Sequence, residues 1–384
     1  MRNPDRDAQI AHNLAVWFGR AARDLPWRRT RDPYRIWLSE VMLQQTRVDT
    51  VIPYYERFLE RFPTVRALAE ANLDDVLALW AGLGYYSRAR SLQRAAQQMV
   101  ERHNAEVPRD PAALRDLAGI GPYTAGAVSS IAFNLPEPLV DGNVARVLAR
   151  VHKVESDIKS PEAQEIFWQS AARLVRADPA VPPSVLNQAL MELGALLCTP
   201  TRPACGMCPL EKLCKARIEN ITETLPITAP RAKPKPANIV SAVVWHAGKV
   251  LLARRKAQGL FGGMWEPPLF EAASLENARP FFEPFLFPVT ELRIVTRKPL
   301  RHVLSHRSLA VHVAAAALST PPPETTFTQL PDPYDRSEWA APATLAGGLS
   351  ALAIKILGAA PDPGAPLVLS PSAAKPARAS HRKT

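Results

Sequence analysis

A lone carboxyl in an apolar segment is the first candidate for chemistry. Residues 36–46 read IWLSEVMLQQT, and Glu40 is their only ionisable side chain. On a helix, Glu40 shares a face with Ile36 and Leu43, so the pattern predicts a buried carboxyl. Burial disfavours the charged form and raises the pKa, which would let this group act as a general acid near neutral pH. A capping or ion-paired glutamate is the alternative. The absence of any other ionisable residue in this segment favours a catalytic role.

A second carboxyl, Asp141, stands in VDGN at residues 140–143, directly before a helix predicted from Val144. An aspartate at such a place is commonly a helix N-cap, and taken alone Asp141 is interpreted as one. Its presence in one chain with Glu40 strengthens a chemical interpretation. Two carboxyls held in different protonation states form the arrangement that breaks glycosidic bonds.

The four cysteines of the chain lie close together, with six, two and five residues between successive members: Cys198, Cys205, Cys208 and Cys214. Four thiolates at this spacing can converge on one metal centre. Structural zinc sites usually pair two short knuckles, whereas only one gap here is short. The wider loops suit a bulkier [4Fe–4S] cluster, so the spacing favours iron–sulfur and leaves zinc as the alternative.

A glycine-containing turn between two predicted helices is a candidate phosphate site. Residues 117–127 read LAGIGPYTAGA, in which Gly119 and Gly121 permit a tight turn and Pro122 suits the first turn of a helix. The free N–H groups at that helix start would face a phosphate. An ordinary helical hairpin is the alternative. A dinucleotide site is not expected, because no strand precedes the glycines.

The elements that must position these groups begin with an all-α part. Over residues 1–218, apolar residues recur at three- and four-residue spacing, as in 68–80, 87–103 and 144–151. The following segment, 219–237, contains four prolines with three basic residues between them: Pro226, Pro230, Pro234 and Pro236, and Arg231, Lys233 and Lys235. Proline at this density blocks helix and sheet alike, so the segment is predicted to be an extended basic linker.

The pattern after the linker changes to β-branched runs, which predict an α+β domain over residues 238–350. Its predicted elements are a hairpin formed by 239–246 and 250–255, a helix at 275–286, and further strands at 292–298 and 309–316. The basic, proline-rich tail at 358–384 is expected to be disordered.

Bulk properties agree with a multidomain protein that binds a polyanion. The chain has 384 residues, which exceeds one ordinary core, and a formal net charge of +11. The first twenty residues lack the apolar core of a signal peptide, and no stretch is long and apolar enough to span a membrane. We therefore expect a soluble, intracellular monomer, cytoplasmic or nucleoid-associated, with no membrane partner.

Together the motifs closely resemble those of adenine DNA glycosylases of the MutY type, in the helix-hairpin-helix glycosylase superfamily. The likeness is strong over residues 8–218 and weaker over 238–345. The matching helical segments are LPWR (25–28), WLSEVMLQQTRV (37–48), GLGYYSRAR (82–90), LAGIGPYTAGA (117–127), VDGNVARVLAR (140–150), NQALMELGALLC (187–198) and the cysteine spacing. The later segments GLFGGMWEPP (259–268) and LSHRSL (304–309) resemble the family's C-terminal Nudix-like recognition domain.

This resemblance implies a base excision repair enzyme that carries a [4Fe–4S] cluster. Its partner would be double-stranded DNA with adenine mispaired with 8-oxoguanine or guanine, and the adenine would be flipped out of the duplex and hydrolysed from its sugar. Glu40 would protonate the leaving base at N7, and Asp141 would stabilise the oxocarbenium-like sugar. Tyr123 and Asn143 would support that chemistry.

The resemblance also implies residues that contact the DNA. They are Trp27, Arg28 and Gln188 around the flipped adenine, Gln45 and Tyr85 in the base stack opposite, Gly119 and Gly121 in the hairpin, and Ser305 and His306 against the oxidised guanine. The aromatic residue that usually precedes this Ser-His pair is Leu304 here, which weakens a stacking role at that position.

Three other functions are disfavoured by particular residues of the chain. Lyases of the endonuclease III type place a lysine where this chain has Tyr123, so we expect a monofunctional glycosylase that leaves an abasic site. A non-catalytic DNA-binding redox sensor would not need Glu40 in an apolar stripe. A nucleotide hydrolase is disfavoured because the acidic Nudix signature is missing from residues 270–295.

Overall fold

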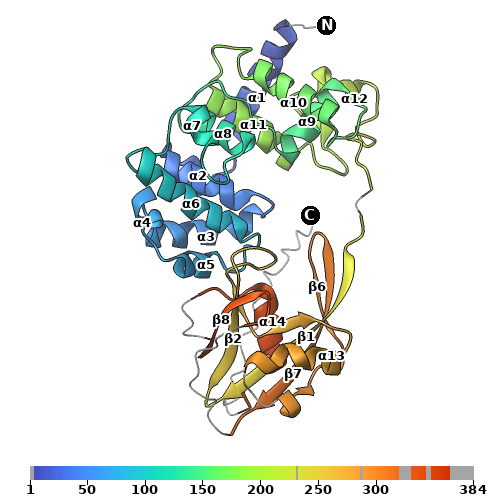
Figure 1. The fold of residues 1–384 in the computed structure, drawn as a ribbon. Helices are drawn as coiled ribbons and strands as arrows, with labels where there is room; N and C mark the ends of the chain where they lie inside the picture. Colours follow the sequence, from blue (N-terminus) through green and yellow to red (C-terminus); the bar gives the residue numbers. More distant parts are fainter. Residues whose placement is uncertain (1–3, 231, 286–288, 320–329, 343–346, 364–384) are drawn as a thin grey trace, which may run out of the picture. The chain divides into compact units, whose positions relative to one another are not determined.

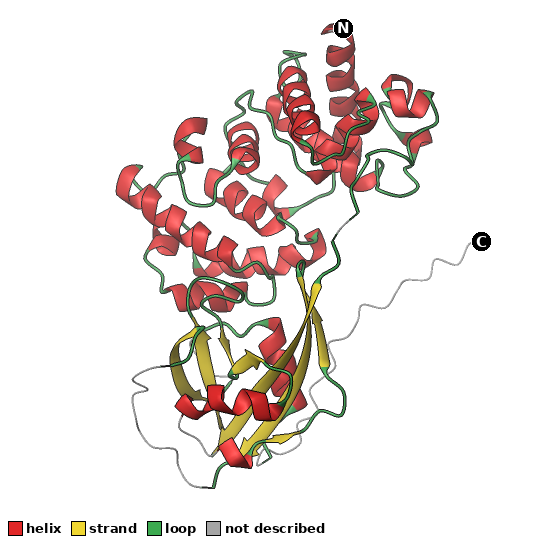
Figure 2. Cartoon of the chain, turned by 45° about the vertical axis from the view of Figure 1, so that its right-hand side comes forward, coloured by secondary structure: helices red, strands yellow, loops and turns green. Residues whose placement is uncertain are grey.

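A computed structural model describes residues 4–230, 232–285, 289–319, 330–342 and 347–363 (Figure 1). The chain divides into two compact units, Met1–Ala232 and Lys233–Thr384, called here the helical unit and the sheet unit. The named strands all belong to the sheet unit (Figure 2). Among the described residues, no helix combines the length and the apolar character that crossing a membrane requires.

The helical unit consists of helices joined by short loops. They are α1 (Pro4–Ala21), the 3-10 turn η1 (Pro26–Arg28), α2 (Pro33–Leu43), α3 (Val48–Arg61), α4 (Val65–Ala69), α5 (Leu73–Trp80), α6 (Ser87–Arg102), α7 (Pro111–Arg115), α8 (Pro122–Ile131), α9 (Gly142–His152), α10 (Pro161–Leu174), α11 (Pro183–Leu196), η2 (Cys205–Met207), η3 (Glu211–Leu213) and α12 (Lys215–Ile218). Proline begins α2, α7, α8, α10 and α11, where its missing N–H costs no helical hydrogen bond.

Two of the predicted helical segments, 87–103 and 144–151, are confirmed as α6 and α9. The third, 68–80, is wrong as a single helix. Asn72 interrupts it by accepting a hydrogen bond from the Asp74 N–H at 2.9 Å, and so caps a new helix, α5. The apolar spacing continues across the break because α4 and α5 both pack against α6.

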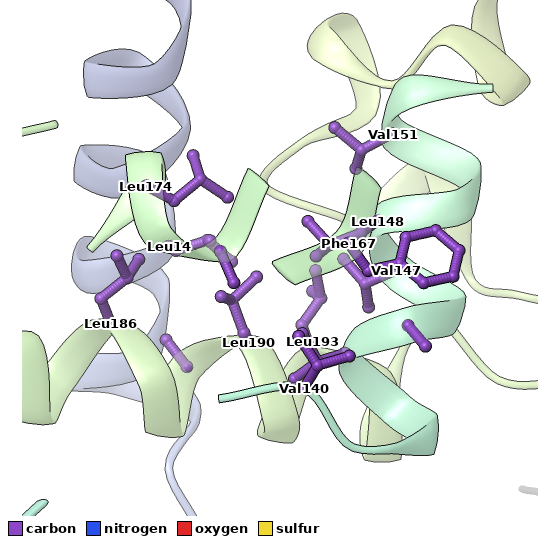
Figure 3. Close-up of a cluster of buried hydrophobic side chains, with 14 of the residues drawn as sticks. Leu14, Val140, Val147, Leu148, Val151, Phe167, Leu174, Leu186, Leu190 and Leu193 are labelled. Atoms are coloured by element: carbon purple, nitrogen blue, oxygen red, sulfur yellow. The ribbon is translucent and has the colours of Figure 1, made fainter. Parts of the chain in front are cut away.

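Helix α11 packs against α1, α8 and α9. The buried core between these helices includes Leu14 of α1, Val147 and Leu148 of α9, Phe167 of α10 and Leu190 of α11 (Figure 3). Each of these side chains is at most 1% exposed. The core therefore holds the start of α9, and Asp141 with it, against α11.

The sheet unit is a mixed sheet with a helix on each face. Its elements are β1 (Lys235–His246), β2 (Lys249–Arg255), β3 (Trp265–Glu266), β4 (Leu269–Glu271), α13 (Leu275–Phe282), η4 (Glu283–Phe285), η5 (Val289–Glu291), β5 (Arg293–Ile294), β6 (Leu300–Val303), β7 (Arg307–Ala317), β8 (Tyr334–Ala340) and α14 (Ala351–Ala359). The main strand order is β3-β2-β1-β7-β5, and β4, β6 and β8 pair with β1, β7 and β2. Strands β1 and β7 are parallel, and the other pairs are antiparallel.

The predicted hairpin is confirmed as β1 and β2, and the predicted helix as α13. Both faces of β1 are covered: Val243 packs on the α14 side and Val244 on the α13 side. This explains why its sequence is a nearly continuous apolar run rather than an alternating one. Only Arg293 and Ile294 of the predicted strand 292–298 form a strand, β5.

The boundaries of the predicted domain need correction at both ends. Strand β1 begins at Lys235, inside the predicted linker, and includes Pro236. Proline is tolerated there because at this end β1 pairs with β7, while its pairing with β4 starts at Ile239.

The predicted end of the domain at 350 is too early, because α14 follows and buries Leu352 and Ile356 in the core of the sheet unit. The Nε1 of Trp245 also donates to the Ala360 carbonyl at 2.9 Å. The start of the predicted disordered tail is thus folded, and residues 364–384 lie outside the described residues.

Candidate active site

The helical unit contains a pocket of about 650 Å³. Pockets of this size hold small organic groups such as a nucleobase. The sequence-predicted residues that line it are Trp27, Arg28, Glu40, Gln45, Gly119, Gly121, Tyr123, Asp141, Asn143 and Gln188. They come from η1, α2 and the loop after it, the turn before α8, α8 itself, the start of α9, and α11, so segments far apart in the chain converge on one space.

Glu40 is the buried carboxyl of this pocket, with 4% of its surface exposed. The Tyr123 hydroxyl donates to Glu40 Oε2 at 2.5 Å, and no ion pair to Glu40 is found within the described ranges. Burial raises the pKa of Glu40 to about 7, and the nearby Asp141 charge adds to this effect. The Tyr123 hydrogen bond and Arg28 act in the opposite direction. Glu40 can therefore hold a proton near neutral pH.

Asp141 is both the N-cap of α9 and part of the pocket. Its carboxylate accepts hydrogen bonds from the Val144 N–H at 2.7 Å and from Asn143 Nδ2 at 3.0 Å. Burial raises the pKa of Asp141, while these hydrogen bonds and Arg146 oppose the rise. The positive end of the α9 dipole also favours an anion here. The two carboxyls differ in their hydrogen bonds, because Asp141 accepts from two donors and Glu40 accepts from Tyr123 alone among the described residues.

Two glycines, Gly119 and Gly126, allow the hairpin and α8 to pack closely against neighbouring segments. Gly119 has a φ of 73°, and a Cβ there would lie 2.5 Å from Ser91 Cβ. A Cβ at Gly126, on α8, would collide with the Pro138 carbonyl oxygen. This close approach brings the segment that ends at Asp141 against α8, which carries Tyr123.

A charged cluster at the pocket wall was missed by the sequence reasoning. Glu192 of α11 is 1% exposed and accepts paired hydrogen bonds from Arg28 at 3.0 and 2.9 Å and from Arg23 at 2.8 and 2.7 Å. Burial alone would raise the pKa of Glu192, but the two arginines outweigh it and lower the pKa to about 2. A signal was present, because Glu192 is the only charged side chain of the segment 187–198, just as Glu40 is in its own.

The remaining predicted DNA-contacting residues of the helical unit differ in environment. Trp27 is buried, and Gln188 Nε2 donates to the Ser184 carbonyl at 2.9 Å. Gln45 and Tyr85 are exposed and sit in loops with left-handed φ values of 58° and 50°. Gln45 lines the pocket, whereas Tyr85 lies outside it.

The four cysteines line one small, apolar pocket between α9, α11 and the loop before α12. All four are free thiols, and Arg150 Nη1 donates to Cys198 Sγ at 3.2 Å. Within the described residues, no three His, Cys, Asp or Glu side chains lie close enough together to hold a metal ion. Burial raises the pKa of Cys208 to about 12, so a thiolate here would need a neutralising cation. The donor set and apolar lining fit an iron–sulfur cluster.

Ser305 and His306 belong to the other unit and are exposed at the turn between β6 and β7. The Leu304 N–H donates to the Arg307 carbonyl at 2.8 Å, which closes the turn. Leu304 packs against the core of the sheet unit. It therefore points away from the surface that Ser305 and His306 present.

Comparison with known proteins agrees with this architecture. The family described as "HhH-GPD superfamily base excision DNA repair protein" matches residues 38–173, and the NUDIX domain family matches residues 240–359. A solved thermostable thymine-DNA glycosylase superposes with a TM-score of 0.51 and 27% identity, over 56% of this chain and 98% of that one. The fold and the pocket therefore define a DNA N-glycosylase of base excision repair.

Sequence relatives identify the family within this class. The human adenine DNA glycosylase is 38% identical over 377 residues, which cover 82% of this chain and 68% of the human protein. The rat adenine DNA glycosylase is 37% identical over 82% of this chain and 71% of its own length. The chain belongs to the adenine DNA glycosylase family, with the helix-hairpin-helix and Nudix-like domains that its motifs predicted.

Proposed function

We propose that this enzyme hydrolyses the N-glycosidic bond of adenine paired with 8-oxoguanine or guanine, and leaves an abasic site. The observation that carries the proposal is the placement of Glu40, buried and hydrogen-bonded to Tyr123, in one pocket with Asp141. Family membership supports adenine as the base. The base must leave the duplex to reach such a pocket.

The chemistry follows from the two carboxyl environments. Glu40 donates its proton to N7 of the flipped adenine, and the electrons of the C1′–N9 bond move into the departing base. The sugar is left with oxocarbenium character, which the Asp141 carboxylate stabilises, before water adds at C1′ and loses a proton. Asn143 holds Asp141 through its amide, and Tyr123 holds Glu40.

Strand cleavage is not part of the proposed reaction. A lyase of this superfamily needs an amine nucleophile that forms a Schiff base with the sugar. Tyr123 stands where such relatives place lysine, and no lysine is among the described residues that line the pocket. Abasic sites should therefore accumulate, and strands should break only after treatment with alkali.

DNA is expected to contact both units. We propose that Trp27, Arg28 and Gln188 surround the adenine and that the hairpin with Gly119 and Gly121 binds a backbone phosphate. The N-cap of α8 is Gly121, which has no side chain to occupy the helix's free N–H groups. Gln45 and Tyr85 would enter the base stack, and Ser305 and His306 would contact the oxidised guanine.

We also propose that the cysteine pocket holds a [4Fe–4S] cluster, with Cys198, Cys205, Cys208 and Cys214 as ligands. When bound, it would cross-link the loop between α11 and α12. Purified enzyme should be brown and contain about four irons and four sulfides per chain. Stoichiometric zinc in a colourless protein would replace this assignment with a zinc site.

The substrate proposal is tested with duplexes that carry adenine opposite 8-oxoguanine, guanine or thymine. We expect base release from the first two and little from the third, measured as strand breaks after alkali. Equal release from all three would contradict the mispair specificity. Breaks without alkali, at the rate of base release, would contradict the monofunctional reaction.

A further inference from the structure

Arg88, on α6, joins two loops that are far apart in the sequence. Its guanidinium donates to the carbonyls of Val41 and Met42, at the end of α2, and to that of Gln44, at 2.8, 2.9 and 2.6 Å. On its other side it donates to the Gly84 carbonyl at 3.1 Å. One side chain therefore bonds to the end of α2 and to the loop before α6, two helices that pack against each other (Figure 1).

Both loops carry a residue in an unfavourable backbone conformation. Gln45 and Tyr85 adopt left-handed φ values of 58° and 50°, which side chains other than glycine seldom take without support from neighbouring structure. Arg88 bonds to Gln44 and Gly84, the residues immediately before them. It also donates to Thr46 Oγ1 at 3.1 Å, directly after Gln45.

The Arg88 side chain contacts the Tyr85 ring as well as the carbonyl of the preceding Gly84. Arg88 Cζ lies 5.5 Å from the centre of the Tyr85 ring and 5.4 Å from that of the buried Trp80. Tyr85 itself is 47% exposed, so one face of its ring is supported while the rest remains free. Burial lowers the pKa of Arg88 only to about 10, so the guanidinium stays charged at neutral pH.

We infer that Arg88 is a positioning residue that locks the Gln45 and Tyr85 loops into one rigid edge, so that both side chains enter the DNA base stack together. This inference rests on the proposed function, because it assumes that Gln45 and Tyr85 contact DNA. Arg88 touches neither the base nor the sugar in this scheme. Its bonds to the end of α2 also tie the edge to the helix that carries Glu40.

The main test replaces Arg88 with lysine, which keeps the charge but cannot reach acceptors on both loops, since an ammonium lacks the planar fork. Release of adenine opposite 8-oxoguanine is measured under single-turnover conditions with saturating holoenzyme. We expect Arg88→Lys to slow release by about 10²-fold, as small misplacements of positioning groups do. A duplex with 2-aminopurine in place of the adenine should show a smaller fluorescence rise on binding, because extrusion is impaired.

A double-mutant cycle separates positioning from general damage. If Arg88 acts through Tyr85, Arg88→Lys should slow release by no more than about threefold in a Tyr85→Ala background. Arg94→Lys, a change of an exposed arginine on the same helix, is the matched control and should leave release unchanged. Losses that multiply in the double variant, with an unchanged fluorescence rise, would overturn the inference.

A milder variant covers the case in which Arg88→Lys does not fold. Thr46→Val removes one acceptor of Arg88 and leaves the charge, and should slow release and reduce the fluorescence rise in the same direction by a smaller factor. An unchanged rate and fluorescence rise in Thr46→Val would overturn the inference in that case. Wild-type enzyme that releases no adenine would instead contradict the proposed function, so the two failures are distinguishable.

Discussion

Glu40 of the helical unit and Glu266 of the sheet unit are both buried glutamates that accept a hydrogen bond from a tyrosine. Tyr123 donates to Glu40 at 2.5 Å, and Tyr334 donates to Glu266 at 2.8 Å. Burial raises the pKa of each carboxyl. By residue type and local environment alone, the two sites would be assigned the same role.

Their surroundings differ in charge and in space. Glu266 is fully buried and paired with Arg255, whose Nε lies 2.5 Å from Glu266 Oε1. Glu40 has no such partner among the described residues and borders a pocket of about 650 Å³. Of these two buried acids, only Glu40 both lacks a neutralising cation among the described residues and borders a pocket, and a proton donor to a bound molecule needs both conditions.

Replacing each glutamate in turn with glutamine should have the largest effect, and only at Glu40 should that effect be on catalysis. Glu40→Gln should slow adenine release by about 10²–10⁴-fold while DNA binding persists, because the proton donor is lost. Glu266→Gln should leave the single-turnover rate nearly unchanged at temperatures where the variant is folded. Glu162→Gln, on the exposed start of α10, is the surface control. Near-normal adenine release by Glu40→Gln would contradict the assignment of Glu40 as the general acid.

Removing Arg255, the cation that pairs with Glu266, should lower the stability of the protein and leave the rate of adenine release unchanged. Arg255→Met leaves Glu266 buried without its partner, and should lower the free energy of unfolding by about 3–5 kcal/mol at neutral pH. The loss should shrink as pH falls, because protonation removes the unpaired charge. Urea unfolding at pH 7.5 and 5.5 measures both effects. A loss that is small and independent of pH would show that the pair is not important for stability.

Removing only the tyrosine hydroxyl tests the hydrogen bond in the sheet unit. Tyr334→Phe should lower the free energy of unfolding by about 1–3 kcal/mol, because Glu266 and the Leu269 N–H, at 2.9 Å from this hydroxyl, lose a partner. Denaturant unfolding followed by tryptophan fluorescence measures the change. Stability equal to that of the wild type would show that the hydroxyl is replaceable.

The corresponding change in the helical unit should instead appear as a shift in pH dependence. Release requires protonated Glu40, so the wild-type rate should fall as pH rises through about 7. The Tyr123 hydrogen bond lowers the pKa of Glu40, and Tyr123→Phe should therefore move this fall to higher pH, by about one unit or less. Single-turnover rates between pH 5.5 and 9 test the sign. A shift to lower pH would contradict the assigned geometry.

Local sequence patterns were sufficient to predict several helices and strands and the burial of one carboxyl. Helical spacing predicted α6 and α9, β-branched runs predicted β1, β2 and β7, and an uncharged stretch predicted the burial of Glu40. The N-cap position of Asp141 was also legible from the sequence. These features depend on residues within a few positions of one another, where periodicity and capping act directly.

Contacts between residues far apart in the chain could not be predicted from these local patterns. Glu40 and Tyr123 are 83 positions apart, and Arg28 and Glu192 are 164 apart, yet each pair is in hydrogen-bond contact. Arg88 shows the same limit, since no local pattern reveals that it bonds to the end of α2. Periodicity says that a face is buried but not against what, because the partner is chosen by the packing of whole helices and sheets.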